Sequence, residues 1–373
     1  MNLSSSILRS DEAAVYRLRA LYEKYGYSRY KVSKFEKYDL YARNKSFLVC
    51  ENILTFTDTT GALMALKPDV TLSIVKNFGV GAEGTGKLYY SETVYRTGNR
   101  SEGFREIRQT GLECIGRIDT YLTGEVVMLA QKSLREMGDR YVLDVSHMGF
   151  LLGLLRAWGI PMGDTDEVLS YMANKNLPAL TAFLAAKGLG DARDAICGIT
   201  TMYEPLETAL PKLRAFVRGD EMEAAYGELK ALSEVMNAWA CDEPLYVDFS
   251  IAGDRNYYNG IIFRGYLSGT PEAVLSGGRY DSLLSRMGRQ GEAIGFAVYP
   301  DRIGYTEDRP PYDVDAVLLY AESDRPADVI AAVRGLETEG RSVRAECGDR
   351  TDTRCRFLYR LKGREAEQIS APV

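Results

Sequence analysis

Polar side chains in two stretches of the sequence have the types and the spacing of a ligand pocket. Gln109 and Glu113 lie four residues apart in a segment with strand character, so both face one side of a sheet, and Gly111 between them leaves room for a ligand. Asp69 and Thr71 share a side if their segment is extended. Carboxylates neutralise an amine, while an amide and tyrosine hydroxyls satisfy ring nitrogens. Together these groups suit a ligand with an ammonium and an imidazole, although each residue alone would be an ordinary polar group of a strand.

The histidine content limits the chemistry, because His147 is the only histidine among the 373 residues. A Ser-His-Asp or Cys-His site would have to be built around it, yet no serine or cysteine elbow accompanies it. Multi-histidine metal sites are excluded. His147 follows a strand that reads as buried. We therefore interpret it as a core or turn residue with satisfied hydrogen bonds, and we expect neither a metal nor a cofactor.

Two glycine-rich matches to phosphate-binding loops do not fit their context. Residues 79–84 match the dinucleotide-binding pattern, and residues 81–87 match the P-loop pattern. Such a loop opens a helix, whereas the residues that follow have strand character, and Leu88 stands where a P-loop needs Ser or Thr. We therefore interpret residues 78–86 as a connection.

Strands must hold the pocket residues, and the hydrophobic pattern shows where these strands lie. Turn residues at 58–61 indicate a hairpin, and a polar loop at 97–103 joins a second pair of strands, which carries Gln109 and Glu113. The expected elements are a helix at 11–26 with Ser10 as its N-cap, strands at 46–56 and 62–66, strands at 87–96 and 106–116, a helix at 124–134 and a strand at 141–145.

The second half of the chain predicts a helical insertion, a return to strands and a short tail. Residues of about 150–240 are rich in Leu, Ala, Met and Glu and read as several helices, broken near 159–161, 176–178 and 188–190. Strands resume at 245–249, 260–266 and 293–298. After the linker at 309–311, the tail begins with a strand at 316–320, a helix at 326–339 and a strand at 342–345. Helices interleaved with antiparallel strands predict an α+β fold, with a core at 1–308 and a small α/β domain at 312–373.

The composition is that of an ordinary globular protein, 46% hydrophobic and 26% charged. With 46 Lys and Arg against 52 Asp and Glu, the net charge is −6, which argues against broad nucleic-acid binding through net charge. No apolar run approaches 18 residues, so no membrane span is expected. The six cysteines form no CxxC pair, and we expect reduced thiols in a cytoplasmic protein.

Four ordered segments together resemble the catalytic core of histidyl-tRNA synthetases, over roughly residues 10 to 305. They are residues 66–71, residues 95–113, residues 248–260, and residues 277–281 with 293–302. The resemblance implies a class II aminoacyl-tRNA synthetase-like antiparallel sheet flanked by helices. It implies that Asp69 and Thr71 bind the amino group of histidine, and that four further residues complete the histidine pocket: Gln109, Glu113, Tyr257 and Tyr258. Arg96 and Arg302 match the arginines of motifs 2 and 3.

Departures from the synthetase pattern point to a paralogous family. Gly253 occupies the position of an arginine that is catalytic in amino-acid activation, and Arg255 lies two residues too far along to replace it. Asp69, Lys67 and Ser33 stand where the synthetases usually have Glu, Arg and Pro. The tail is short for an anticodon-binding domain. These features resemble the ATP phosphoribosyltransferase regulatory subunits, which lack synthetase activity.

That second resemblance implies a non-catalytic subunit of the enzyme that performs the first step of histidine biosynthesis. The implied partner is the short-form catalytic phosphoribosyltransferase, bound to homodimers of the regulatory chain within a hetero-octamer. Histidine is the implied feedback effector, and no tRNA binding is expected. Whether histidine uses the old pocket or a subunit interface stays open. Arg96, Arg105 and Arg302 could retain an ATP-like phosphate site or could make only salt bridges. The alternatives are a divergent histidyl-tRNA synthetase and a paralogue with another amino-acid-linked duty, such as modifying a protein.

Overall fold

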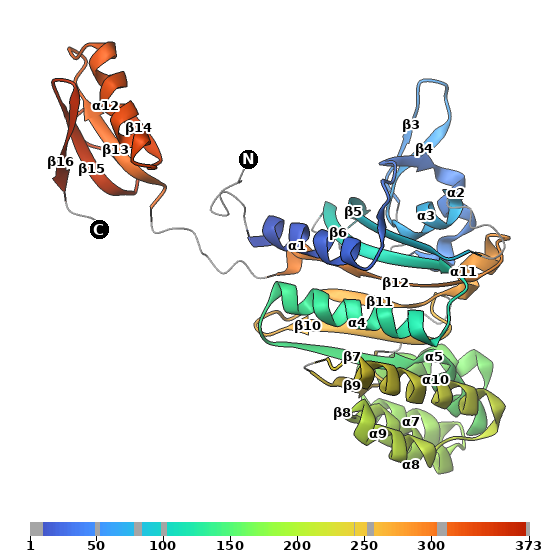
Figure 1. Cartoon of the computed structure of the whole chain (residues 1–373). Helices are drawn as coiled ribbons and strands as arrows, with labels where there is room; N and C mark the ends of the chain where they lie inside the picture. Colours follow the sequence, from blue (N-terminus) through green and yellow to red (C-terminus); the bar gives the residue numbers. More distant parts are fainter. Residues whose placement is uncertain are drawn as a thin grey trace. The chain divides into compact units, whose positions relative to one another are not determined.

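The chain divides into two compact units, Met1–Gly304 and Tyr305–Val373 (Figure 1). The structure is a computed structural model that describes residues 10–48, 53–77, 84–97, 103–241, 243–251, 257–303 and 312–370. Within these residues, no helix is both long enough and apolar enough to span a lipid bilayer.

The larger unit is built on a nine-stranded sheet that is mostly antiparallel. Its strands, in spatial order, are β1 (Ser28–Arg29), β5 (Gly86–Thr97), β6 (Phe104–Gly116), β12 (Glu292–Val298), β11 (Leu275–Arg279), β10 (Ile261–Leu267), β7 (Tyr141–His147), β9 (Leu245–Asp248) and β8 (Tyr203–Pro205). The predicted strands at 87–96, 106–116 and 141–145 are therefore confirmed, as are those that resume after residue 244.

The hairpin β5–β6 gives the sheet two chemically different faces. The two strands pair without a break from Gly86 opposite Ile115 to Thr97 opposite Phe104. Because side chains alternate along a strand, Gln109 and Glu113 face one side of the sheet, while Arg108 and Thr110 face the other. Helices cover both faces and leave a cavity on each.

One face of the sheet carries α1 (Ser10–Lys24) and α4 (Thr120–Met137), which pack against each other and against the strands (Figure 1). The predicted helix at 11–26 is thereby confirmed, and Gly26 follows it with φ of 80°, a left-handed conformation suited to glycine. The other face carries the short helices α2 (Tyr38–Arg43), α3 (Thr71–Asn77) and α11 (Asp281–Arg286), whose apolar side chains share a second core with Leu88, Tyr90 and Val94 of β5.

A three-stranded sheet of β2 (Phe35–Lys37), β4 (Leu63–Leu66) and β3 (Thr55–Thr57) adjoins that second core. The hairpin β3–β4 confirms the predicted turn, since Asp58 Oδ1 accepts hydrogen bonds from the backbone N–H groups of Thr60 and Ala62. The prediction that the first strand starts at residue 46 is wrong. Lys45–Phe47 forms a 3₁₀ turn, which buries the Phe47 ring against Tyr257.

Residues 148–238 form the predicted helical insertion. Gly159 and Gly188 follow the helices that end at Ala157 and Ala186, and their φ angles are 75° and 69°. Asn176 caps the helix that begins at Leu177, because its side chain accepts a hydrogen bond from Ala179 N–H at 3.2 Å. These are the expected breaks. The helices are α5 (Met148–Ala157), α6 (Thr165–Ala173), α7 (Leu177–Ala186), α8 (Arg193–Thr201), α9 (Leu206–Arg214) and α10 (Gly219–Ala238), with 3₁₀ turns at Met162–Asp164 and Gly190–Ala192.

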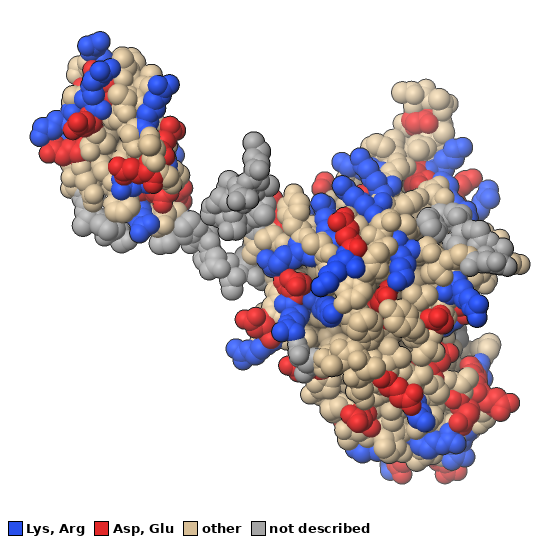
Figure 2. All heavy atoms as spheres, in the orientation of Figure 1, with Lys and Arg blue, Asp and Glu red and all other residues tan. Residues whose placement is uncertain are grey.

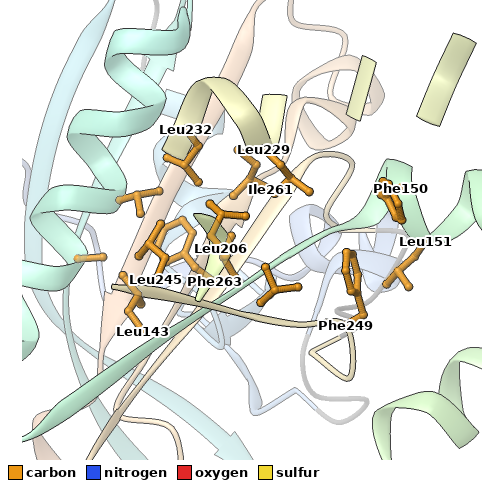
Figure 3. Close-up of a cluster of buried hydrophobic side chains, with 14 of the residues drawn as sticks. Leu143, Phe150, Leu151, Leu206, Leu229, Leu232, Leu245, Phe249, Ile261 and Phe263 are labelled. Carbon is orange, nitrogen blue, oxygen red and sulfur yellow. The ribbon is translucent and has the colours of Figure 1, made fainter. Parts of the chain in front are cut away.

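The insertion shares one hydrophobic core with the large sheet. Leu206, Leu229 and Leu232 of the helices meet Leu245, Ile261 and Phe263 of the strands (Figure 3). Phe249, at the end of β9, stacks on Phe150 of α5 with ring centroids 5.3 Å apart. This stacking fixes Phe249 against the insertion, directly after β9.

His147 is a structural residue, as the sequence indicated. Its side chain is 3% exposed, its Nδ1 accepts from Phe150 N–H at the start of α5, and its Nε2 lies 3.1 Å from Glu228 Oε2 on α10. His147 thus caps one helix of the insertion and ties it to another.

Replacing His147 by alanine is expected to lower the free energy of unfolding by about 1–2 kcal/mol, because the cap of α5 and the part-buried hydrogen bond to Glu228 are lost. Replacing it by asparagine, which can still cap α5, should restore part of that loss. Chemical denaturation checks both values. Unchanged stability in the alanine variant would refute the capping role.

The smaller unit has a four-stranded sheet, in the order β14 (Val343–Cys347), β13 (Val314–Tyr320), β15 (Cys355–Lys362) and β16 (Glu365–Ser370). The helix α12 (Pro326–Thr338) connects the parallel strands β13 and β14. The predicted strand–helix–strand start of the tail is therefore confirmed, and Ala332 and Leu336 bury the helix against Ala316, Leu318 and Tyr359.

Candidate functional site

The six pocket residues predicted from the sequence surround one cavity on the α3 side of the large sheet. Its volume is about 380 Å³. They are joined by side chains from β5, β10, β11 and β12. The lining residues are Phe47, Leu48, Asp69, Thr71, Tyr90, Arg96, Gln109, Glu113, Tyr257, Tyr258, Arg264, Ser276, Tyr280, Gly295, Phe296, Ala297 and Tyr299.

Asp69 and Thr71 reach the cavity from a helix start. An extended segment would have put both side chains on one side, but the chain turns after Leu66 and α3 begins at Thr71. Asp69 Oδ1 accepts a hydrogen bond from Leu72 N–H at 2.8 Å, and this side-chain cap is what the extended prediction missed. Burial raises the pKa of Asp69, and the nearby Arg96 opposes that rise. The short α3 therefore presents a carboxyl and a hydroxyl together.

Glu113 is the most strongly perturbed carboxyl of the cavity. Thr71 Oγ1 donates to its Oε1 at 2.7 Å, and the Tyr280 hydroxyl donates to its Oε2. Burial raises the pKa of Glu113 to about 8, despite these two hydrogen bonds, which lower it. Burial thus favours the protonated form of this carboxyl, and a cationic ligand would favour its ionised form.

Two glycines allow the close packing around the cavity. A Cβ on Gly295 of β12 would lie 1.9 Å from Glu113 Oε2, so only glycine fits beneath this carboxylate. The expectation that Gly111 leaves room for a ligand is wrong in detail. A Cβ there would meet the Phe296 carbonyl oxygen at 2.2 Å and the Tyr90 hydroxyl at 2.8 Å. Gly111 makes room for Tyr90, which then lines the cavity.

Tyr257 and Tyr258 close the cavity from the segment that follows β9. Their rings are in edge contact, with centroids 4.7 Å apart, and Tyr257 also hydrogen-bonds to Thr71. Tyr258 hydrogen-bonds to Ser276 and lies over Gly278, where a Cβ would be 2.7 Å from the Tyr258 ring. Burial raises the pKa of both hydroxyls, so both stay neutral. Gly253 and Arg255, on which the sequence argument about catalysis depends, lie outside the described residues.

The three arginines named from the sequence have different positions. Arg96 lines the cavity, and its Nε donates to the Pro68 carbonyl oxygen at 2.9 Å. Arg302 does not line it, because its Nη1 donates to Ala273 O at 2.7 Å and its Nε lies 3.3 Å from Glu272 Oε2. Arg105 is exposed on β6 and does not line the cavity either.

Sequence reasoning missed Tyr90, Tyr280, Arg264 and Ser276 as site residues. The register of the sheet shows why they meet: Arg264 pairs with Ser276, Ser276 with Ala297, and Ala297 with Gly111. This row crosses four strands and has small residues in its middle, which form the floor of the cavity. Tyr280 lies in one of the four segments that carry the family resemblance, but only the fold brings its hydroxyl to Glu113.

The cavity offers buried carboxyls at Asp69 and Glu113, neutral tyrosine hydroxyls, the Gln109 amide and a cation at Arg96. This arrangement can bind a zwitterion, with the ammonium on the carboxyls and the carboxylate on the arginine. The hydroxyls and the amide can satisfy ring nitrogens. Within the part of the chain that the structure describes, no group of three or more His, Cys, Asp or Glu side chains is placed to hold a metal ion.

The family resemblance implies histidine as the ligand, and on that basis replacing Tyr280 by phenylalanine is expected to weaken histidine binding about tenfold. The variant removes the hydroxyl that donates to Glu113 and stabilises its ionised form, which is worth about 1.5–3 kcal/mol for a charged acceptor. Tyr121→Phe is a matched control, because that hydroxyl also donates to a glutamate, Glu125, on the other side of the molecule's sheet. Calorimetric titration measures both, and equal affinities would contradict the assigned role.

The family model described as Histidyl-tRNA synthetase matches residues 4–303 of the chain. Among curated proteins, the chain is 26% identical over 339 residues to the ATP phosphoribosyltransferase regulatory subunit of Alkaliphilus metalliredigens. The aligned region covers 87% of this chain and 85% of that relative.

Solved structures of two related proteins have the same fold. The crystal structure of an ATP phosphoribosyltransferase regulatory subunit/histidyl-tRNA synthetase from Bacillus halodurans superposes with a TM-score of 0.73 at 22% identity, over 91% of this chain and 88% of that one. A chain of the ATP phosphoribosyl transferase (HisG:HisZ) complex from Thermotoga maritima gives 0.60 at 20% identity, over 80% and 98%. The predicted α+β fold of the class II synthetase type is therefore confirmed.

Proposed function

Because this chain belongs to the histidyl-tRNA synthetase family, we propose that it acts as the regulatory subunit of ATP phosphoribosyltransferase and has no catalytic activity of its own. The observation that carries the proposal is the match to curated regulatory subunits over most of both chains. The sequence adds a second argument, since Gly253 stands where the synthetases carry a catalytic arginine. The chain would then serve the first step of histidine biosynthesis.

Histidine is the ligand that the cavity suits best. In this proposal Asp69 and Thr71 hold its amino group, and Arg96 holds its carboxylate. Gln109, Glu113, Tyr257 and Tyr258 surround the imidazole, whose two nitrogens need one donor and one acceptor in the neutral form. Glu113 and the tyrosine hydroxyls can supply both. The ion pair and backbone hydrogen bond of Arg302 favour a structural role for that arginine rather than a phosphate site.

The proposed partner is the short-form catalytic phosphoribosyltransferase, bound to homodimers of this chain in a hetero-octamer in the cytoplasm. The related complex from Thermotoga maritima supports the pairing of the two kinds of chain. We further propose that residues 1–308 act as the regulatory core and that residues 312–373 are a reduced counterpart of an anticodon-binding domain. Histidine occupancy would be coupled to transferase activity through the subunit interface.

A histidyl-tRNA synthetase is the second candidate function, because the carboxyls, amide and tyrosines of the pocket are those expected for histidine activation. Histidine-dependent exchange of pyrophosphate into ATP, followed by charging of tRNA, separates the two functions. We expect neither reaction above background with the purified chain. Charging of tRNA would overturn the regulatory proposal, even if histidine binds.

A further inference from the structure

One side of the cavity that the proposed function assigns to histidine is closed by a tyrosine that stands in front of an arginine. Tyr299 lines the cavity, whereas Arg302, three residues later, does not. The Cζ atom of Arg302 lies over the Tyr299 ring, 4.4 Å from its centroid. One face of the ring is thus covered by the guanidinium, and the rest of the ring is left to face the cavity. The phenol therefore separates this cation from the space that a ligand would occupy.

The local sequence Tyr-Pro-Asp-Arg explains why the two side chains stack. A 3₁₀ turn at Pro300–Arg302 follows β12, and in such a turn side chains three residues apart lie on the same side. The backbone N–H of Arg302 donates to the Tyr299 carbonyl oxygen at 3.0 Å. The backbone N–H of Tyr299 donates in turn to Val274 O at 2.8 Å, which ties the start of the turn to the neighbouring strand. The backbone therefore sets the position of the stacked pair.

The other contacts of Arg302 lie at the protein surface and are easily exchanged. Its Nη1 donates to the Ala273 carbonyl oxygen at 2.7 Å, and its Nε lies 3.3 Å from Glu272 Oε2. The Glu272 side chain is 66% exposed, and an ion pair this exposed contributes little to stability. Figure 2 shows acidic and basic side chains interspersed on the visible face of the larger unit, which is the usual setting of such pairs. The ring of Tyr299 is therefore the main barrier between this guanidinium and the cavity.

The hydroxyl end of Tyr299 reaches two other tyrosines of the cavity. Burial is the main cause that raises the pKa of the Tyr90 and Tyr258 hydroxyls, and the nearby Tyr299 adds to the rise in both. The ring that stacks on Arg302 thus extends from the 3₁₀ turn into the cavity. The space that remains is about 380 Å³, near the lower end of the range of small-molecule sites. It suits one amino acid, whereas an amino acid and a nucleotide together need more room.

We propose that Tyr299 determines which ligands this cavity accepts, admitting a single amino acid and excluding a nucleoside triphosphate from the space beside it. A nucleotide needs cations for its phosphate oxygens and room for its base. Tyr299 fills that room and covers Arg302. Among the described residues, the cations that do line the cavity are Arg96 and Arg264, and the proposed function already assigns Arg96 to the amino-acid carboxylate. The inference rests on the proposed function for the identity of the amino acid alone.

Calorimetric titration of the full chain with ATP tests the proposal, with circular dichroism to confirm that each variant is folded. Tyr299→Ala and Tyr299→Ser are the opened variants, which remove the ring and allow Arg302 to turn into the cavity. Tyr299→Phe keeps the ring and its stacking, and a combined variant adds Arg302→Gln to Tyr299→Ala. The matched control is Tyr226→Ala, because Arg214 lies over the Tyr226 ring at 5.4 Å and neither residue lines the cavity.

We expect the opened variants to bind ATP about tenfold or more tightly than the wild type, Tyr299→Phe and the control do, and we expect the combined variant to lose this gain. Equal affinity of the wild type and a folded opened variant, a gain that the combined variant keeps, or the same gain in Tyr226→Ala would overturn the proposal. Histidine titrated into the wild type tests the proposed function separately. If it does not bind while the opened variants still gain ATP binding, the proposed ligand fails and the role of Tyr299 stands.

Discussion

Replacing Glu113 by alanine is expected to weaken histidine binding about 100-fold. The carboxyl is 2% exposed and is held by Thr71 and Tyr280, so it is fixed in place before a ligand arrives. A charge-assisted hydrogen bond to a buried carboxylate contributes about 1.5–3 kcal/mol, and the variant also leaves two hydroxyls without an acceptor. Isothermal titration calorimetry measures the change directly.

Two further variants separate a lost contact from a damaged fold. Glu113→Gln keeps the size of the side chain and an acceptor for the hydroxyls but cannot ionise, so it should fold normally and still bind histidine weakly. Glu106→Ala removes an exposed glutamate of the same strand and should bind as the wild type does. Wild-type affinity in a folded Glu113→Ala variant would show that histidine does not use this cavity.

The stability of the chain is expected to fall as the pH rises from 6.5 to 8. The folded structure raises the pKa of Glu113 from 4.5 to about 8, mainly through burial. Between these two values the folded chain binds one more proton than the unfolded chain, so the stabilisation is fully present below pH 4.5 and is lost as the pH approaches 8. At most this gives about 1.4 kcal/mol per pH unit. Asp144, whose pKa is raised to about 6, changes stability in the same direction but at lower pH.

Urea denaturation at four pH values between 6.5 and 8, on the wild type and on Glu113→Gln, isolates the contribution of this residue. The glutamine variant cannot titrate, so the difference in free energy of unfolding between the two proteins should change by about 1 kcal/mol per pH unit. A difference that stays constant with pH would mean that Glu113 is ionised throughout and that its pKa is not raised. Saturating histidine should flatten the slope, because the bound cation favours the carboxylate.

The sequence was informative wherever the fold depends on local pattern. Alternation placed Gln109 and Glu113 on one face of β6, and glycine and asparagine marked the ends of the helices in the insertion. The tyrosine pair and the acidic residues were found through their spacing and their family resemblance. They meet in one cavity because the strands bring them together.

The site features that could not be predicted from the sequence depend on contacts between distant segments. The pairing of Arg264 with Ser276, and of Ala297 with Gly111, requires the order of four strands, which no local pattern contains. The space beside Gly111 could not be assigned to Tyr90 without the neighbouring strand. Asp69 was expected in an extended segment, but its side chain caps α3. An aspartate side chain can hydrogen-bond to a nearby backbone N–H, which favours a helix start over an extended strand.

The most direct test of the regulatory function is the transferase rate of a short-form catalytic subunit, measured alone and after titration with this chain, each with and without histidine. We predict that the rate rises on mixing until the two chains reach a fixed ratio, and that histidine then lowers it. The complex made with Glu113→Ala should be activated equally and should need much more histidine for inhibition. A rate unaffected by this chain at any ratio would contradict the account.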